Sequence, residues 1–264
     1  MRQVILFDMD GTLTLPRKKI SIEMIRKLKD LSTYADIGIV TGSGYDYLEQ
    51  QCKELWFDIG SVPLSKITLL PCNGTQVYSA SDKCNKLSLR HKSNMRKEIG
   101  ADKFDRVMKC LSYMQLLHCC KNPSHALTGH FISYRGSLIN WCPVGRNADD
   151  NQRNGFIEYD IENKMRLSAK DSIQKYLSAY NIDNISLALG GSTSIDIFPT
   201  GWDKTYALNH FQDKLCWFVG DSCDTDGNDK ALYDLLKIEN RAYKTSGPAE
   251  TLEIIDRIIE KIKN

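Results

Sequence analysis

The sequence predicts an α/β fold: a Rossmann-like core on a parallel sheet, with an α+β domain inserted into it. Residues 4–7 (Val-Ile-Leu-Phe) and 37–40 (Ile-Gly-Ile-Val) are continuous apolar runs, typical of strands buried on both faces of a parallel sheet. An amphipathic helix is expected between them, so the opening of the chain predicts a β-α-β unit. The same pattern returns at residues 215–219 (Leu-Cys-Trp-Phe-Val).

The distance between these runs predicts a core that is discontinuous in sequence. From about residue 92 the chain mixes helical segments with alternating strands, of which residues 130–135 are an example. We therefore expect a catalytic core of residues 1–91 and 199–264, and an inserted α+β cap domain of residues 92–198.

Individual elements follow from local patterns. Ser21 is placed to cap a helix whose apolar residues share one side. Residues 67–70 read as a further strand, and residues 75–90 as a hairpin with its turn at 81–83. The last helix carries an isoleucine stripe, which we interpret as facing the core rather than a membrane or a partner. The two stripes consist of Ile22, Ile25, Leu28 and Leu31, and of Ile254, Ile255, Ile258, Ile259 and Ile262.

Composition excludes several classes of protein. Lys and Arg number 35 against 33 Asp and Glu, so the net charge of +2 gives no field that would attract nucleic acid or a membrane surface. The start of the chain has no signal-peptide pattern, and no apolar run is long enough to cross a bilayer. The nine cysteines form no CxxC pair. We expect reduced thiols and a cytoplasmic protein.

The strongest chemical signal follows the first strand. Residues 8–12 read Asp-Met-Asp-Gly-Thr, which places two carboxylates at a strand end, where open α/β sheets bind their ligands. Asp8 can attack phosphorus to form an aspartyl-phosphate, and Asp10 can give and take the proton of a sugar oxygen. Gly11 permits a tight turn.

Three further motifs follow in order along the chain, and with the first they resemble the signature of the haloacid dehalogenase superfamily. The resemblance implies that the Thr41 hydroxyl binds the transferring phosphoryl group and that Lys204 offsets negative charge around it. It also implies a Mg²⁺ cofactor held by Asp8, Asp221 and the backbone carbonyl of Asp10, with Asp229 supporting the metal site. The motifs are Thr41-Gly42-Ser43, Lys204 in Gly-Trp-Asp-Lys, and Gly220-Asp221 with Gly227-Asn228-Asp229.

The inserted segment narrows the resemblance to the eukaryotic-type phosphomannomutase family. Residues 131–146 end in Pro-Val-Gly-Arg, and residues 190–204 read Gly-Gly-Ser-Thr-Ser-Ile-Asp-Ile-Phe-Pro-Thr-Gly-Trp-Asp-Lys. Arginine forks match phosphate bidentately, so a cap with several of them suits a substrate with a second phosphate. The resemblance implies that the substrate is bound by Arg135, Asn140, Arg146, Arg153, Ser194 and Asp196.

The family implies an isomerase that interconverts mannose 6-phosphate and mannose 1-phosphate and feeds GDP-mannose synthesis. Its implied partners are a hexose phosphate, a hexose 1,6-bisphosphate activator and a second copy of the chain, bound through the cap. Thr41 departs from the family, which has Gly there, and is the usual residue in related sugar-phosphate phosphatases. A Mg²⁺-dependent sugar-phosphate phosphatase is therefore the alternative, and a non-catalytic sugar-phosphate binder is a third reading.

Overall fold

The chain divides into two compact units, each described by itself. The computed structural model describes residues 2–57, 61–81, 84–121 and 126–263. The first unit comprises Met1–Lys92 and Trp202–Asn264, and the second comprises Ser93–Gly201. The roles of these units as catalytic core and cap remain a prediction.

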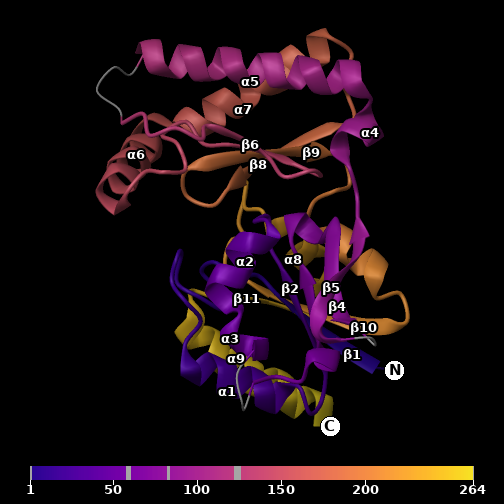
Figure 1. The fold of residues 1–264 in the computed structure, drawn as a ribbon. Helices are drawn as coiled ribbons and strands as arrows, with labels where there is room; N and C mark the ends of the chain where they lie inside the picture. The colour runs from indigo at the N-terminus through magenta and orange to yellow at the C-terminus, as the bar shows by residue number, and fades with distance from the viewer. Residues whose placement is uncertain (1, 58–60, 82–83, 122–125, 264) are drawn as a thin grey trace. The chain divides into compact units, whose positions relative to one another are not determined.

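A seven-stranded sheet organises the first unit, in the order β11-β10-β1-β2-β3-β4-β5 (Figure 1). The strands from β11 to β3 are parallel neighbours, whereas β4 and β5 form an antiparallel hairpin at one edge. The expected α/β fold with a parallel-dominated sheet is therefore confirmed. The strands are β1 (Arg2–Phe7), β2 (Asp36–Val40), β3 (Ile67–Leu70), β4 (Gln76–Ser81), β5 (Cys84–Lys92), β10 (Lys214–Gly220) and β11 (Ala242–Lys244).

Helices cover both faces of this sheet because its strands are apolar on both sides. Ile5 and Phe7 of β1 pack in one cluster with α1, α2 and α9, while Val4 and Leu6 face the opposite cluster with α8 and η3. Helices α1 and α9 lie in contact with each other (Figure 1). The helices of this unit are α1 (Ile22–Leu31), α2 (Tyr45–Cys52), α3 (Glu54–Phe57), η1 (Leu64–Lys66), η2 (Cys72–Gly74), η3 (Lys204–His210), α8 (Lys230–Lys237) and α9 (Pro248–Lys263).

The first helix confirms one expectation and corrects another. The hydroxyl of Ser21 accepts a hydrogen bond from the backbone N–H of Met24 at 3.1 Å, so it caps the helix as predicted. Ile22, however, is 69% exposed, and Met24 is buried together with Leu28 and Leu31. Successive residues of the predicted stripe, three apart, are offset by about 60° around the helix axis. Over the three steps from Ile22 to Leu31 the offset adds up, so these two residues lie on opposite sides.

The isoleucine stripe of α9 faces the core as expected. Ile254, Ile255 and Ile258 are fully buried in the same cluster as Ile5 and Phe7 of β1. Across the described residues, the helices fall short of the length and apolarity that a bilayer crossing requires. No disulfide joins the cysteines whose side chains the structure describes. The expected hairpin is present, and Asp82 and Lys83 of its expected turn lie outside the described residues.

The second unit is built on a four-stranded antiparallel sheet in the order β6-β7-β9-β8. Strand β6 is shorter than the alternation over residues 130–135 suggested. Helices α5 and α7 pack on each other, and Trp141 of β7 donates a hydrogen bond to Gln115 of α5 at 2.8 Å. The elements are α4 (Met95–Ile99), α5 (Ala101–Lys121), β6 (Ile132–Tyr134), β7 (Ile139–Trp141), α6 (Asp150–Asn163), α7 (Met165–Ala179), β8 (Ile185–Gly190) and β9 (Ser194–Pro199).

An ion-pair triad ties together the amino ends of the strands. Asp36, at the start of β2, pairs with Lys66 at 3.1 Å and with Lys214 at 2.9 Å. Burial acts to raise the pKa of Asp36, but hydrogen bonds from both lysines outweigh it, so the pKa lies below its ordinary value. A carboxyl group with a lowered native pKa stabilises the fold above its unfolded pKa and loses that contribution as the pH falls.

We expect Asp36→Asn to lower the free energy of unfolding at pH 7 by about 1 kcal/mol. The difference from the parent should shrink as the pH falls below about 3.9, the pKa of an unfolded Asp. Urea unfolding at pH 7 and pH 3 measures both values. Equal stability of the two proteins at pH 7 would contradict the assignment.

Candidate active site

The predicted catalytic residues gather at one edge of the first unit's sheet. Asp8, Thr41 and Asp221 directly follow β1, β2 and β10, which are adjacent and parallel. Because the carboxyl ends of parallel strands meet at the same edge, the fold brings the three side chains to one place. The backbone N–H of Asp8 donates to the carbonyl oxygen of Val219 at 2.9 Å, which fixes the start of the loop after β1 against the end of β10.

Three carboxylates converge there. One oxygen from each of Asp8, Asp221 and Asp229 lies within 4.8 Å of the others. Gly11 permits this approach, because a Cβ at that position would lie 2.5 Å from Oδ2 of Asp221. Its φ of +89° also belongs to the region that favours glycine. The requirement for Gly11 is therefore steric as well as conformational.

Lys204 lies between two of these acids. Its Nζ donates to Oδ1 of Asp8 and to Oδ1 of Asp229, and none of its side chain is exposed. The second oxygen of Asp229 accepts a hydrogen bond from the backbone N–H of Ser222 at 3.0 Å. Asp229 thus holds both the lysine and the loop that carries Asp221.

The electrostatics of the cluster favour a further cation. Burial raises the pKa of Asp8 well above its usual value, and repulsion from Asp229 and Asp221 adds to it despite Lys204. Burial and Asp229 likewise raise the pKa of Asp221. Burial acts to lower the pKa of Lys204, but Asp229 and Asp8 outweigh it and raise the pKa. Three carboxylates therefore face one ammonium group, and hard oxygen donors of this kind fit Mg²⁺.

Asp10 is held separately, by a network that the sequence did not reveal. Its Oδ1 accepts hydrogen bonds from the Gln51 amide at 3.1 Å, the Tyr47 hydroxyl at 3.5 Å and the backbone N–H of Arg17 at 3.4 Å. The Gln51 carbonyl oxygen in turn accepts from the Thr14 hydroxyl at 3.0 Å. Gln51 and Tyr47 lie on α2, so this helix orients the predicted acid and base. No sequence motif marked them, since a glutamine in a helix is commonplace.

Burial raises the pKa of Asp10, against the hydrogen bonds from Gln51, Arg17 and Tyr47 that favour its ionised form. A raised pKa suits a carboxyl group that both gives and takes a proton. The Asp10 carboxylate is not among the three that converge, which belong to Asp8, Asp221 and Asp229. Thr41 is buried, and its hydroxyl oxygen accepts from the Ser43 N–H at 3.1 Å.

In the second unit, four of the six predicted substrate-binding residues form one connected network. Asn140 donates from Nδ2 to Oγ of Ser194 at 2.8 Å and to Oδ1 of Asp196 at 2.7 Å. Its Oδ1 accepts from Arg146 at 3.1 Å. Asn140 and Asp196 are register partners on β7 and β9, while Trp141, the next residue of β7, faces α5. By alternation, the network lies on the sheet face opposite α5.

The two remaining arginines lie near element ends. Arg153 is in the first turns of α6, where its guanidinium donates to the hydroxyls of Thr193 at 3.1 Å and Ser192 at 3.2 Å. Arg135 follows β6, and its backbone N–H bonds the carbonyl of Leu138 at 2.9 Å. Ser192 and Thr193 were not singled out in the sequence, although they lie within the Gly-Gly-Ser-Thr-Ser motif.

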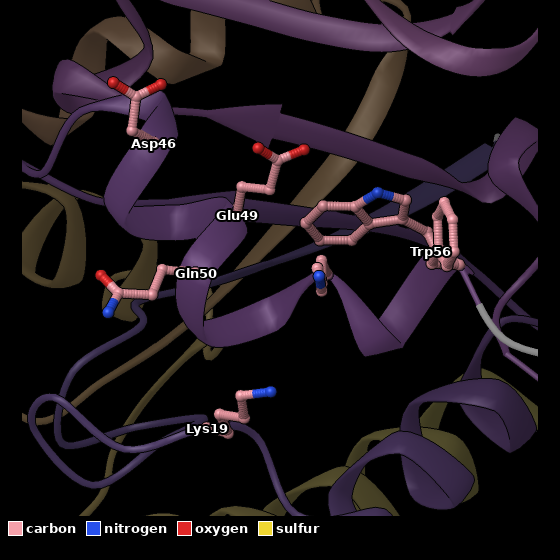
Figure 2. A pocket seen from close by; sticks show the side chains of 7 residues that line it. Lys19, Asp46, Glu49, Gln50 and Trp56 are labelled. Carbon is pink, nitrogen blue, oxygen red and sulfur yellow. The ribbon is translucent and has the colours of Figure 1, made fainter.

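A surface hollow of about 480 Å³ lies beside α2 and α3 (Figure 2). Asp46, Glu49 and Gln50 come from α2 and Trp56 from α3, with Lys19 from the segment before α1. The lining consists of Lys19, Asp46, Glu49, Gln50, Lys53, Trp56 and Phe57. None of the predicted site residues lines this hollow.

Sequence comparisons agree with the pattern of motifs. A family model described as eukaryotic phosphomannomutase matches residues 23–261. A phosphomannomutase of Drosophila melanogaster is 32% identical over 266 residues, which cover 97% of this chain and 95% of that protein. Phosphomannomutase 2 of Dictyostelium discoideum is 29% identical over 257 residues, covering 96% and 95%.

Solved structures share the fold at low identity. An IMP-nucleotidase of Plasmodium falciparum superposes with a TM-score of 0.66 at 12% identity, over 98% of this chain and 68% of that one. A trehalose-6-phosphate phosphatase related protein gives a TM-score of 0.53 at 14% identity, over 99% and 100%. This chain therefore shares its fold with these proteins.

If the acidic cluster binds Mg²⁺, the metal should stabilise the folded chain. A concentration about 100 times Kd should add about 2.7 kcal/mol to the free energy of unfolding. We expect Asp221→Asn to lose most of this gain. Thermal unfolding with and without MgCl₂ measures it, with Asp224→Asn as the control, because Asp224 is an exposed acid of the same loop, paired with Lys244. An equal gain in Asp221→Asn and the parent would rule out this metal site.

Proposed function

The chain belongs to the eukaryotic phosphomannomutase family, and we propose on this basis that it interconverts mannose 6-phosphate and mannose 1-phosphate, feeding GDP-mannose synthesis. One observation carries the chemistry. A buried lysine neutralises part of an acidic cluster that contains Asp8, while Asp10 is held apart at the end of the same strand. This arrangement suits phosphoryl transfer to and from a carboxylate.

We propose that Asp8 carries the phosphoryl group. An Asp8 oxygen attacks the phosphorus of a hexose 1,6-bisphosphate, so an O–P bond forms and the bond from phosphorus to the sugar oxygen breaks. Asp10 gives its proton to the departing sugar oxygen. For the return step Asp10 takes the proton of a sugar hydroxyl, whose oxygen then attacks the aspartyl-phosphate. Bisphosphate is re-formed, and Asp8 is released.

The remaining residues of the first unit position and neutralise charge. The Lys204 ammonium offsets negative charge on Asp8 and the phosphoryl group, and the Thr41 hydroxyl hydrogen-bonds phosphoryl oxygens. Asp8, Asp221 and the Asp10 carbonyl are the residues that would hold Mg²⁺, with Asp229 holding Lys204 in place. When bound, the metal supplies charge stabilisation for the transferring phosphoryl group.

The second phosphate of the substrate needs an anchor of its own. We propose Arg135, Arg146 and Arg153 for this role, because guanidinium forks bind phosphate bidentately. Asn140, Ser194 and Asp196 then address sugar hydroxyls or phosphate. Asn140 is supported in this role by Arg146, which donates to its Oδ1. This makes residues 93–201 the substrate-binding cap of a catalytic core.

The partners follow from the same proposal. A hexose 1,6-bisphosphate primes the enzyme, because it supplies the first phosphoryl group to Asp8. The protein acts in the cytoplasm as a homodimer formed through the second unit. Tyr113 and Leu116 on α5 support such an interface, since these large apolar residues are 57% and 58% exposed.

The test is an assay of mannose 1-phosphate with Mg²⁺ and a trace of hexose 1,6-bisphosphate, following mannose 6-phosphate and free phosphate together. We expect interconversion, and Asp8→Asn should lower turnover at least about a thousandfold because the nucleophile is lost. Asp46→Asn, an exposed acid on α2, is the control. Phosphate release without mannose 6-phosphate would instead identify the phosphatase to which Thr41 points. Full turnover by Asp8→Asn would refute both.

Gln51→Leu tests how Asp10 is held. Loss of the amide donor should lower kcat by about tenfold to a hundredfold, because a small misplacement of a catalytic group is costly. KM should change little, since Gln51 contacts no predicted substrate-binding residue. Thr14 keeps its hydrogen bond to the Met9 carbonyl, which limits the loss of stability. Gln50→Leu, the exposed neighbour on the same helix, is the matched control, and equal kcat in both variants would speak against this role.

A further inference from the structure

We propose that Arg166, clamped by Asp160, is a positioning residue that sets the place of the Arg153 guanidinium and hence the affinity for the second phosphate of the substrate. The inference rests on the proposed function, since it gives Arg153 a phosphate to bind. No sequence motif marks either Arg166 or Asp160.

Asp160 fixes both ends of Arg166. Oδ1 of Asp160 accepts the backbone N–H of Arg166, and Oδ2 accepts its Nε, both at 2.7 Å. The side chains are only 11% and 10% exposed. Neutralised in this way, the buried guanidinium still has donors for other acceptors.

Those donors reach the turn between β8 and β9. Nη1 of Arg166 lies 2.9 Å from the carbonyl oxygen of Gly191 and 3.3 Å from that of Ser194. The two carbonyls stand on either side of Ser192 and Thr193. A single guanidinium therefore ties down both ends of the segment that carries these two hydroxyls.

The same segment holds Arg153. The hydroxyl of Thr193 accepts a hydrogen bond from Nη1 of the Arg153 guanidinium, and the hydroxyl of Ser192 accepts one from Nη2. Two contacts on one planar group fix its orientation as well as its place. Any shift of the turn is thus passed on to Arg153.

The contacts close into a ring. Arg153 and Asp160 both lie on α6, seven residues apart, so they project from the same side of the helix about two turns from each other. From Asp160 the ring passes through Arg166 at the start of α7 to the turn, and from the turn back to Arg153. Arg153 and Arg166 thus both link the helices to the turn, and Arg166 holds the backbone of the segment whose hydroxyls bind Arg153.

The experiment measures binding of glucose 1,6-bisphosphate by titration calorimetry and KM for mannose 1-phosphate. Arg166→Lys keeps the charge beside Asp160, but its single nitrogen cannot bind Asp160 and the two carbonyls as the separate Nε and Nη1 of the guanidinium do. We expect Kd and KM to rise about tenfold, with little change in kcat. Arg96→Lys is the matched control, because Arg96 pairs with Asp105 in the same unit and both side chains are 52% exposed.

A double-variant cycle separates positioning from general stability. If Arg166 acts through Arg153, Arg166→Lys combined with Arg153→Lys should bind no more weakly than Arg153→Lys alone. Effects on Kd that multiply, or a Kd for Arg166→Lys equal to that of the parent, would overturn the inference. If Arg166→Lys does not fold, Asp160→Asn loosens the same clamp and is judged by the same cycle.

Binding and turnover fail separately. If the parent binds the bisphosphate and the cycle is non-additive, but no hexose phosphate is interconverted, the positioning role stands while the proposed function falls. A parent that does not bind the bisphosphate contradicts the inference as well. If the parent interconverts the hexose phosphates but the effects of the two substitutions on Kd multiply, the proposed function stands and the positioning role of Arg166 is rejected.

Discussion

The structure of the candidate site depends on the ion pairs that Lys204 makes with Asp8 and Asp229. A buried ammonium group is tolerated only when it is paired, and buried carboxylates have the same need. The lysine therefore holds two loops from different parts of the sheet edge at one point. One ammonium group does not balance three carboxylates, so the cluster keeps a negative charge that favours binding of a divalent cation. Removing either partner would leave an uncompensated buried charge.

Where local chemistry decides the structure, the sequence predicted it well. The apolar runs before Asp8 and Asp221 form buried strands as their pattern predicted, and Ser21 caps its helix as its position suggested. Prediction failed where tertiary packing decides. Ile22 matched an apolar stripe but lies in solvent, because the buried side of the helix is set by Met24 and its neighbours.

For the site, strand-end acids were found because the residue type and its place in the pattern carry the signal together. Asn140, Ser194 and Asp196 were found by family resemblance, and the structure joins them by hydrogen bonds. Sequence analysis did not identify Gln51 and Arg166, because each is proposed to act through another side chain that is distant in sequence. Such supporting residues have ordinary identities, and only the folded backbone shows what they touch.

The complete enclosure of Lys204 has a consequence for its reactivity. Acylating reagents and acetyltransferases need an unprotonated amine that they can approach, and this one is shut off from solvent and held as a cation by two carboxylates. In the native protein Lys204 should therefore not react with amine-labelling reagents, while exposed lysines such as Lys19 do. A label found on Lys204 would mark molecules in which the loops around Asp8 had already come apart.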